Sequence, residues 1–461
     1  MLRWFMGSRE PQGGAEKSLV LNIGEEQTQN HYTELTALKV HSDIVRFLVQ
    51  IDDCRFASAC DDGSVYIWDV KTGEVLFELQ GHKQKITAVV VFKTSEHFEE
   101  RIDFILTASA DKTVIAWNCE TGQQIQTATD FQSPVKTLTV LQRLDVWLSG
   151  GGELRVWNRE FKLLCETGYF MDRGISALIE LPKNCVAAAV GKDLSIFKLS
   201  AASGGFDRWD ITQIKCISSH QDNVRALISV NDLTFVSGSD AGELIVWDAI
   251  DWTIQSYERS FLDTSSPQEV PQEIKLMQRQ EVVSIQHLAS DGEYIFAGVG
   301  KGIYVYKLET KRIITAQKRA HDLNIEHLAT LPNRQLVSCS EDGSVRIWEL
   351  RLTQHLHAEP VQTGFFSIWG FGKSNKQSNQ TIKKKPDNCI VASLDLIGDL
   401  IGHSSTVQMF LYCNNHGLVT CSADHLIILW KEGKKESRLR SQMLFHKLEE
   451  NWDPQLRFSL S

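Results

Sequence analysis

Histidine, serine or threonine, and aspartate recur together along this chain, and these residue types could perform hydrolysis. In the segment SCSEDGSVRIWE, Ser338 and Asp342 lie close in sequence, and His321 precedes them. In a hydrolase the serine oxygen attacks the substrate while a histidine removes the serine proton. Several copies of one such set in a single chain are better explained as structural hydrogen-bond networks than as several active sites. We therefore predict that these residues stabilise the fold.

The elements that must carry these residues are themselves repeated. Segments such as ILTASADKTVIAWN and FVSGSDAGELIVWD contain a strand that ends in Ser or Thr, a turn with Asp, and an alternating strand that closes on an aromatic residue. The closing aromatics are Trp68, Trp117, Trp157, Phe197, Trp247, Tyr306, Trp348 and Trp430. Most of their spacings are near the roughly 40–45 residues of a four-stranded propeller blade. The repeat predicts an all-β fold of eight small antiparallel sheets that stabilise one another by stacking.

Composition and short motifs exclude several other classes of protein. The formal net charge of −10 over 461 residues argues against a nucleic-acid-binding protein. The N-terminus lacks the apolar run of a signal peptide, and no segment approaches the ~18 apolar residues of a membrane span. The ten cysteines show no zinc-type spacing, and most lie in apolar strands, as expected for reduced structural thiols. Since no catalytic motif is present either, we expect no enzyme activity, cofactor or metal site.

The repeated segments resemble those of the WD40-repeat β-propeller family over residues 32–431. The resemblance implies a structural tetrad of His, Ser or Thr, Asp and Trp in each complete blade. Four units contain it: His41, Ser58, Asp62 and Trp68; His82, Thr107, Asp111 and Trp117; His321, Ser338, Asp342 and Trp348; and His403, Thr420, Asp424 and Trp430. The fifth unit has the other three residues, but its Asp240 is one position early. Units three, four and six have Gly151, Gly191 and Gly300 at the Asp position.

A long insertion separates the last strands of the predicted seventh blade. One strand is expected to end near Leu350 and the next to begin at Ser393, which leaves 351–392 between them. A connection of this length is typical of a functional or disordered segment. It holds six basic residues against two acidic ones and the aromatic stretch TGFFSIWGFGK.

We predict that this insertion is a recruitment loop that inserts into a cavity of a partner protein or partly into a membrane interface. In the alternative interpretation its aromatic side chains pack against the outer edge of the blade. The residues predicted to make the contact are Phe365, Phe366, Trp369, Phe371 and Lys373.

Both ends of the chain depart from the repeat near the last blade. Residues 1–31 are predicted to form a flexible arm, and Tyr32–Val40 to supply the outer strand that the last blade lacks. Within residues 432–461, four apolar residues are spaced for one face of an amphipathic helix: Leu439, Met443, Leu444 and Leu448. This helix either packs on the propeller or docks onto a partner. Arm and helix should emerge side by side and form one composite docking surface.

The chain also resembles one member of the family nearly end to end, in stretches such as LQRLDVWLSGG and LVTCSADHLIILWK. That resemblance implies a non-catalytic cytosolic adaptor of a complex of two DENN-domain proteins, acting in autophagy and nutrient response. It implies recruitment of this complex to the lysosomal surface through a transporter of cationic amino acids. GTPase-activating activity would belong to the DENN-domain partners.

A different class of function is the alternative. WD40 proteins that serve as substrate receptors of cullin-RING ubiquitin ligases carry a Trp-Asp-x-Arg box at the end of a blade. This chain has Trp348-Glu349-Leu350-Arg351, with Glu in place of Asp.

Overall fold

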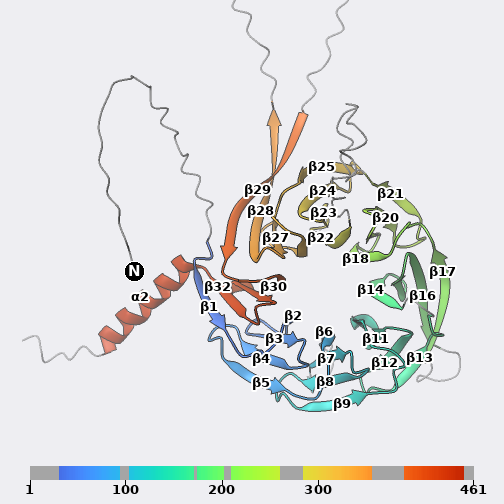
Figure 1. The fold of residues 1–461 in the computed structure, drawn as a ribbon, viewed down its shortest axis with the longest axis horizontal. Helices are drawn as coiled ribbons and strands as arrows, with labels where there is room; N and C mark the ends of the chain where they lie inside the picture. Colours follow the sequence, from blue (N-terminus) through green and yellow to red (C-terminus); the bar gives the residue numbers. More distant parts are fainter. Residues whose placement is uncertain are drawn as a thin grey trace, which may run out of the picture.

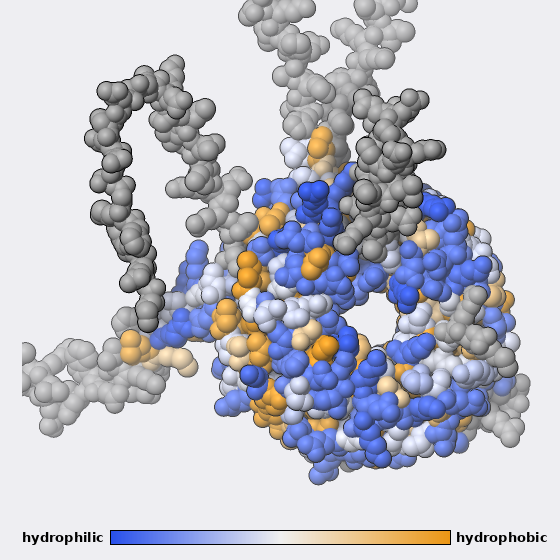
Figure 2. Space-filling view, in the orientation of Figure 1, coloured by the Kyte–Doolittle hydropathy of each residue, from blue (hydrophilic) through white to orange (hydrophobic). Residues whose placement is uncertain are grey.

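The computed structural model describes residues 31–93, 103–170, 174–201, 209–259, 284–355 and 389–450. These residues form eight four-stranded antiparallel sheets, arranged as blades around a central opening, and one α-helix after the last blade (Figure 1). Figure 2 shows the opening from the same side. The predicted all-β, eight-bladed propeller with a C-terminal helix is confirmed.

In blades one to seven, consecutive strands run from the central opening to the rim (Figure 1). The first four blades consist of β2 (Val45–Gln50), β3 (Arg55–Cys60), β4 (Val65–Asp69) and β5 (Val75–Leu79); β6 (Ile86–Phe92), β7 (Phe104–Ser109), β8 (Val114–Asn118) and β9 (Gln124–Ala128); β10 (Thr137–Leu141), β11 (Val146–Gly150), β12 (Leu154–Asn158) and β13 (Leu163–Glu166); and β14 (Ile175–Leu181), β15 (Cys185–Val190), β16 (Asp193–Ala201) and β17 (Trp209–Ile217).

The other blades consist of β18 (Val224–Asn231), β19 (Thr234–Ser239), β20 (Leu244–Asp248) and β21 (Ile254–Glu258); β22 (Ile285–Ser290), β23 (Tyr294–Val299), β24 (Gly302–Lys307) and β25 (Arg312–Gln317); β26 (Ile325–Thr330), β27 (Gln335–Ser340), β28 (Ser344–His355) and β29 (Cys389–Ile401); and β30 (Val407–Tyr412), β31 (Leu418–Ser422) and β32 (Ile427–Lys431), completed by β1 (Glu34–Leu38).

The last blade is closed by the beginning of the chain. β1 pairs antiparallel with β32, in a register that runs from Glu34 opposite Lys431 to Leu38 opposite Ile427. The prediction that Tyr32–Val40 supplies this outer strand is therefore confirmed. Strand pairing between the two ends of the chain closes the ring and leaves β32 without an open edge.

The hydrophobic core lies between blades rather than within them. The closing aromatic of each blade packs against the blade that precedes it: Trp117 contacts blade one, Trp348 contacts blade six and Trp430 contacts blade seven. Each small sheet buries its faces only against the neighbouring sheets. The second strand of a blade is therefore buried on both faces. Phe104–Ser109, for example, is buried at every position.

The insertion leaves the seventh blade through longer strands than the sequence predicted. β28 and β29 pair as far as His355 opposite Cys389, so the expected ends at Leu350 and Ser393 were wrong by several residues. β27 pairs with β28 only up to Glu349, and beyond it the two strands form a ribbon that projects from the ring (Figure 1). Pairing across the ribbon satisfies the backbone groups on the facing edges of the two strands, without a third strand. The segment 356–388 lies outside the described residues.

The helix α2 (Gly433–Glu450) begins two residues after β32 and runs outward from the closing blade (Figure 1). It lies within residues 432–461, where the sequence predicted a helix. Within the part of the chain that the structure describes, no helix is long and apolar enough to cross a membrane. The predicted arm, residues 1–31, lies outside the described residues except for His31.

Candidate partner-docking site

The residues that could do chemistry form closed hydrogen-bond networks in three blades. In blade seven, His321 Nε2 lies 2.6 Å from Ser338 Oγ, and Trp348 Nε1 donates to the same oxygen at 2.8 Å. His321 Nδ1 lies 3.1 Å from Asp342 Oδ2. Two further sets repeat this arrangement: His82, Thr107, Asp111 and Trp117, and His403, Thr420, Asp424 and Trp430.

The electrostatics of this network suit a structural role. Burial lowers the pKa of His321 to about 4, so the imidazole is neutral near pH 7. Burial works to raise the pKa of Asp342, but hydrogen bonds from Ser344 outweigh it and hold this pKa at about 2. Ser338 is fully buried and already accepts the indole N–H. A substrate carbonyl could reach its oxygen only if the blade opened.

Blade one carries a variant of the tetrad. His41 Nε2 lies 2.7 Å from Ser58 Oγ, but His41 Nδ1 lies 3.1 Å from Ser64 Oγ, and Asp62 accepts a hydrogen bond from the Ser42 hydroxyl instead. Asp62 is exposed to solvent and is not hydrogen-bonded to the histidine as the aspartates of the other three tetrads are.

The same blade holds a group of potential metal ligands. One ligand atom each of His41, Cys60 and Asp62 lie within 4.8 Å of one another. Cys60 stands two residues after Ser58, where the other complete tetrads have a serine: Ser109, Ser340 and Ser422. The hydroxyl of each of these serines donates a hydrogen bond to a backbone oxygen in the segment just before the first strand of its blade. We interpret Cys60 as a replacement for such a serine, and no metal role is inferred.

In blade five the structure shows a residue that the sequence did not reveal. Glu243 is fully buried and takes the place of the tetrad aspartate, 3.2 Å from His220 Nδ1. Asp240 instead pairs with Arg225 at 2.8 Å. Glu243 stands six residues after Ser237, where other tetrads have Ser64, Thr113 and Ser344. The sequence signal for this role was a glutamate at a position where the other tetrads have serine or threonine. The glutamate side chain is longer than that of aspartate, so it reaches the histidine from there.

The strongest departure from a plain propeller lies where the two ends of the chain meet. Arg440 of α2 forms an ion pair with Glu34 of β1 at 2.5 Å. The hydrogen bond from Arg440 holds the pKa of the Glu34 carboxyl below its usual value. A Cβ at Gly433 would clash with the Thr33 hydroxyl, so the helix starts directly against the chain that enters β1. These contacts position α2 on the closing strand.

Beyond this anchor, the apolar side chains of α2 that the structure describes are open to solvent. Leu439 is 43% exposed, Met443 65% and Leu444 59%. Figure 2 shows apolar side chains on α2 away from the ring. The interpretation that this part of the helix packs on the propeller is therefore wrong. Leu448 lies in α2, but its side chain lies outside the described residues.

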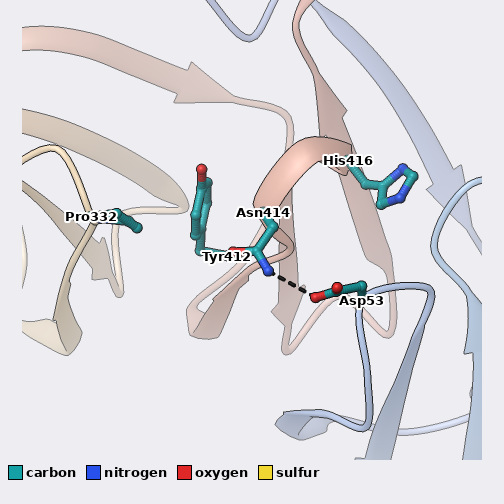
Figure 3. A pocket seen from close by; sticks show the side chains of 5 residues that line it. All are labelled: Asp53, Pro332, Tyr412, Asn414 and His416. Carbon is teal, nitrogen blue, oxygen red and sulfur yellow. Dashed lines mark hydrogen bonds between the residues drawn. The ribbon is translucent and has the colours of Figure 1, made fainter.

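Two adjoining hollows lie beside the start of the helix. The larger has a volume of about 370 Å³ and is lined by inner turns of three blades, with Pro332, Asp53, Tyr412, Asn414 and His416 (Figure 3). Asn414 donates to Asp53 at 2.9 Å and joins blade eight to blade one.

The smaller hollow, about 200 Å³, shares its inner wall with the larger one and reaches the first turn of α2. It is lined by Tyr32, Tyr412, Asn414, His416, Gly417, Glu432, Lys435 and Glu436. We call α2, β1 and these two hollows the closing-blade surface. The sequence predicted a composite surface of this helix and the arm 1–31, but the arm lies outside the described residues except for His31, so that prediction remains open. Sequence reasoning did not find the two hollows.

The predicted recruitment residues Phe365, Phe366, Trp369, Phe371 and Lys373 lie outside the described residues. The ribbon that leads to them exposes Leu352 and Val391. Arg351, the last residue of the Trp-Glu-Leu-Arg box, lies in this ribbon and pairs with Glu349 at 2.8 Å and Asp395 at 3.3 Å. These ion pairs engage the arginine within its own blade and do not favour the ubiquitin-ligase alternative.

The blades and their tetrads define the class of protein as a WD40-repeat β-propeller. The model of the WDR41 β-propeller family matches residues 1–440. The chain is similar to WD repeat-containing protein 41 of Homo sapiens, with 63% identity covering 98% of this chain and 99% of that protein, and to the Mus musculus protein of the same name, with 59% identity and the same coverage. The chain therefore belongs to the WDR41 β-propeller family.

Solved structures of the same fold include Sqt1 from Chaetomium thermophilum, with a TM-score of 0.61, 15% identity, and coverage of 86% of this chain and 98% of that chain. The computationally designed Ika8 protein has a TM-score of 0.59 and 20% identity, with the same coverage. At this identity the likeness shows the fold alone. Membership of the family supports the role of a scaffold or adaptor in protein–protein interactions.

Proposed function

We propose that this protein is a non-catalytic adaptor that binds a heterodimer of DENN-domain proteins through the closing-blade surface. Through its insertion, it recruits this complex to lysosomes by way of a transporter of cationic amino acids. The protein would act from the cytoplasm in autophagy and the response to nutrients. The identity of these partners follows from the family resemblance, and the observation that carries the docking site is the solvent-exposed apolar side of α2.

Several features of the closing-blade surface suit a protein partner. A helix that presents Leu439 and Met443 one turn apart can lay both side chains into a groove of another protein. Arg440 lies between Leu439 and Leu444 around the helix, at ~100° per residue, and its surface ion pair with Glu34 favours this orientation of the helix before binding. A helix fixed in advance loses less conformational entropy when it binds.

The ribbon supports a separate recruitment role for the insertion. β28 and β29 hold both ends of the segment 356–388 in one two-stranded element that projects from blade seven (Figure 1). Phe366, Trp369 and Phe371 would then act at a distance from α2. One partner could be bound at each element at the same time, which is the task of an adaptor.

The docking proposal is tested by changing Leu439, Met443 and Leu444 together to Ser in the full chain. We expect at least a tenfold loss of affinity for the purified DENN-domain heterodimer in a calorimetric titration, because all three apolar contacts are lost. The matched control changes Lys434, Arg438 and Gln442 to Ser, three exposed positions at i, i+4 spacing on the same helix. Equal affinity of the two variants would overturn the docking role of α2.

The recruitment proposal is tested in cells with Phe366, Trp369 and Phe371 all changed to Ala. We expect this variant to keep its DENN-domain partners in affinity purification but to leave the lysosome in imaging. The α2 variant should show the opposite pattern and reach the lysosome without the partners. A recruitment variant that still reaches the lysosome would contradict the role given to the insertion.

A further inference from the structure

The first turns of α2 carry a sequence pattern that the docking role does not use. Residues 434–437 read Lys-Lys-Glu-Ser. Ser437 is the only serine or threonine of the sequence with basic residues at both the second and the third position before it. Protein kinases select substrates by charge, and two cations at these positions suit a kinase with acidic side chains in its substrate groove. The sequence therefore marks Ser437 as a candidate phosphate acceptor.

The acceptor and its basic residues are open to a kinase. Ser437 and Lys434 are exposed, and Lys435 is half-buried. A kinase must also straighten the segment that it binds. Since the helix α2 exposes the apolar side chains that the structure describes, little packing supports it. Most of the stability of a helix in a protein comes from such packing, so the first turns of α2 can open locally at small cost.

Ser437 lies on the side of α2 that holds the helix to the closing strand. It stands four residues after Gly433 and three before Arg440, and residues at these spacings share one side of a helix. The backbone N–H of Gly433 donates to the backbone oxygen of His31 at 3.3 Å. Arg440 pairs with Glu34 on the same side. A phosphate on Ser437 would therefore lie beside the ion pair that anchors the helix.

The charge of a phosphate is large enough to change this ion pair. A phosphoserine carries about −1.5 to −2 charges near pH 7 and offers three acceptor oxygens, whereas the Glu34 carboxylate carries one charge. Side chains three positions apart on a helix are neighbours, so the guanidinium of Arg440 can bond the phosphate of its own helix. The phosphate also repels the carboxylate of Glu34. Both effects weaken the contact between α2 and β1.

We propose that a protein kinase phosphorylates Ser437 and that the phosphate draws Arg440 away from Glu34, which releases α2 from β1. In this step Ser437 Oγ attacks the γ-phosphorus of ATP, the bond from this phosphorus to the β–γ bridging oxygen breaks, and ADP leaves. The catalytic aspartate of the kinase accepts the hydroxyl proton. The consequence for partner binding rests on the proposed docking role of α2. A helix released from β1 is no longer pre-oriented and binds the DENN-domain heterodimer less tightly.

The first test incubates the full-length chain with ATP and the catalytic subunit of cAMP-dependent protein kinase, and locates the phosphate by mass spectrometry. We expect phosphate on Ser437, none at this position in Ser437→Ala, and a rate at least about tenfold lower in Lys435→Gln. Ser441→Ala, one turn further along the same helix, is the matched control and should be modified at Ser437 at the wild-type rate. Absence of phosphate from Ser437 of the wild type would overturn the proposal.

The second test follows the phosphorus NMR signal of the phosphorylated chain as the pH is changed. The second pKa of a phosphoserine is about 6, and a guanidinium that contacts the phosphate lowers it. Arg440→Gln should therefore raise this pKa relative to the phosphorylated wild type. An equal pKa in the two proteins would refute the contact between the phosphate and Arg440.

The third test measures the affinity of the phosphorylated and the unmodified chain for the purified DENN-domain heterodimer by calorimetric titration. We expect the phosphorylated chain to bind roughly three- to fivefold more weakly, the range that the loss of one surface ion pair can produce. In Arg440→Gln the two forms should bind alike. Equal affinity of the two wild-type forms would overturn the release of α2. Failure of both forms to bind would refute the docking proposal alone, because the first two tests decide on Ser437 without a partner.

Discussion

At the scale of single residues, buried polar groups decide which blade positions tolerate change. The hydroxyls of Ser58 and Ser338 each join a histidine and a tryptophan. In blade five, Glu243 does from a different sequence position what aspartate does elsewhere. The carboxylate that bonds the histidine can thus come from different sequence positions. A low local dielectric makes each such group costly to leave unpaired.

Two buried cysteines should respond differently to the same substitution. Cys60→Ser restores the residue found at this position in the other complete tetrads, and we expect the free energy of unfolding to change by less than about 1 kcal/mol. Cys421 is fully buried in the apolar cluster between blades eight and one. Cys421→Ser should therefore lose roughly 1–3 kcal/mol by burying a hydroxyl there. Urea unfolding of both variants measures the difference, and equal losses would contradict our interpretation of Cys60.

At the scale of elements, β1 has two tasks. The strand closes the ring by pairing with β32, and Leu38 packs against the core shared by blades eight and one. Glu34 holds α2 through Arg440, and Leu35 faces solvent. A strand from the start of the chain therefore links the closure of the propeller to the position of the docking helix.

Leucines at two positions of β1 provide a matched test of ring closure. Leu38 is 8% exposed and Leu35 is 51% exposed. Leu38→Ala should lower the free energy of unfolding by about 2–3 kcal/mol through lost burial and a cavity. Leu35→Ala should leave the stability within about 0.5 kcal/mol of the wild type. Chemical denaturation of the two variants decides this. An equally small change for both would mean that β1 is held by backbone pairing alone and would contradict the role given to Leu38.

At the scale of the whole molecule, the blades share a set of histidines that are kept neutral. Burial lowers the pKa of His41, His321 and His287 to about 4 and that of His327 to about 3. Further histidines shifted downward by burial are His82, His220 and His403. In the unfolded chain each would titrate near pH 6.5. Neutral histidines thus couple the stability of the ring to pH.

Stability should fall as the pH drops from about 6.5 towards 4. The unfolded chain binds protons in this window and the folded chain does not, so protonation favours unfolding. For His321 alone the loss between pH 7 and 5 is roughly 1–2 kcal/mol. Urea unfolding between pH 7.5 and 5 should show this fall. His321→Asn should be less stable at pH 7 and should show a shallower pH dependence. An equally steep dependence in that variant would contradict the assignment.

The amino-acid sequence by itself determined the eight blades, the closing strand, the complete tetrads and the presence of the C-terminal helix. The blades and the helix follow from local periodicity and turn residues, which can be recognised without knowledge of distant contacts. The tetrads and the closing strand were expectations from the resemblance to the WD40-repeat family. The long insertion was also evident, because it interrupts that period. The exact ends of β28 and β29 were not, since a two-stranded ribbon continues for as long as its backbone groups remain paired.

Only the tertiary structure decided which residues from distant parts of the chain meet. Asp53 and Asn414 line one hollow because the ring closes, and Glu34 reaches Arg440 because β1 pairs with β32. No periodic pattern in the sequence indicates that these residues lie close together in the folded chain. The exposure of Leu439, Met443 and Leu444 likewise depends on the outward direction of α2. An amphipathic pattern is the same whether a helix packs on its own domain or waits for a partner.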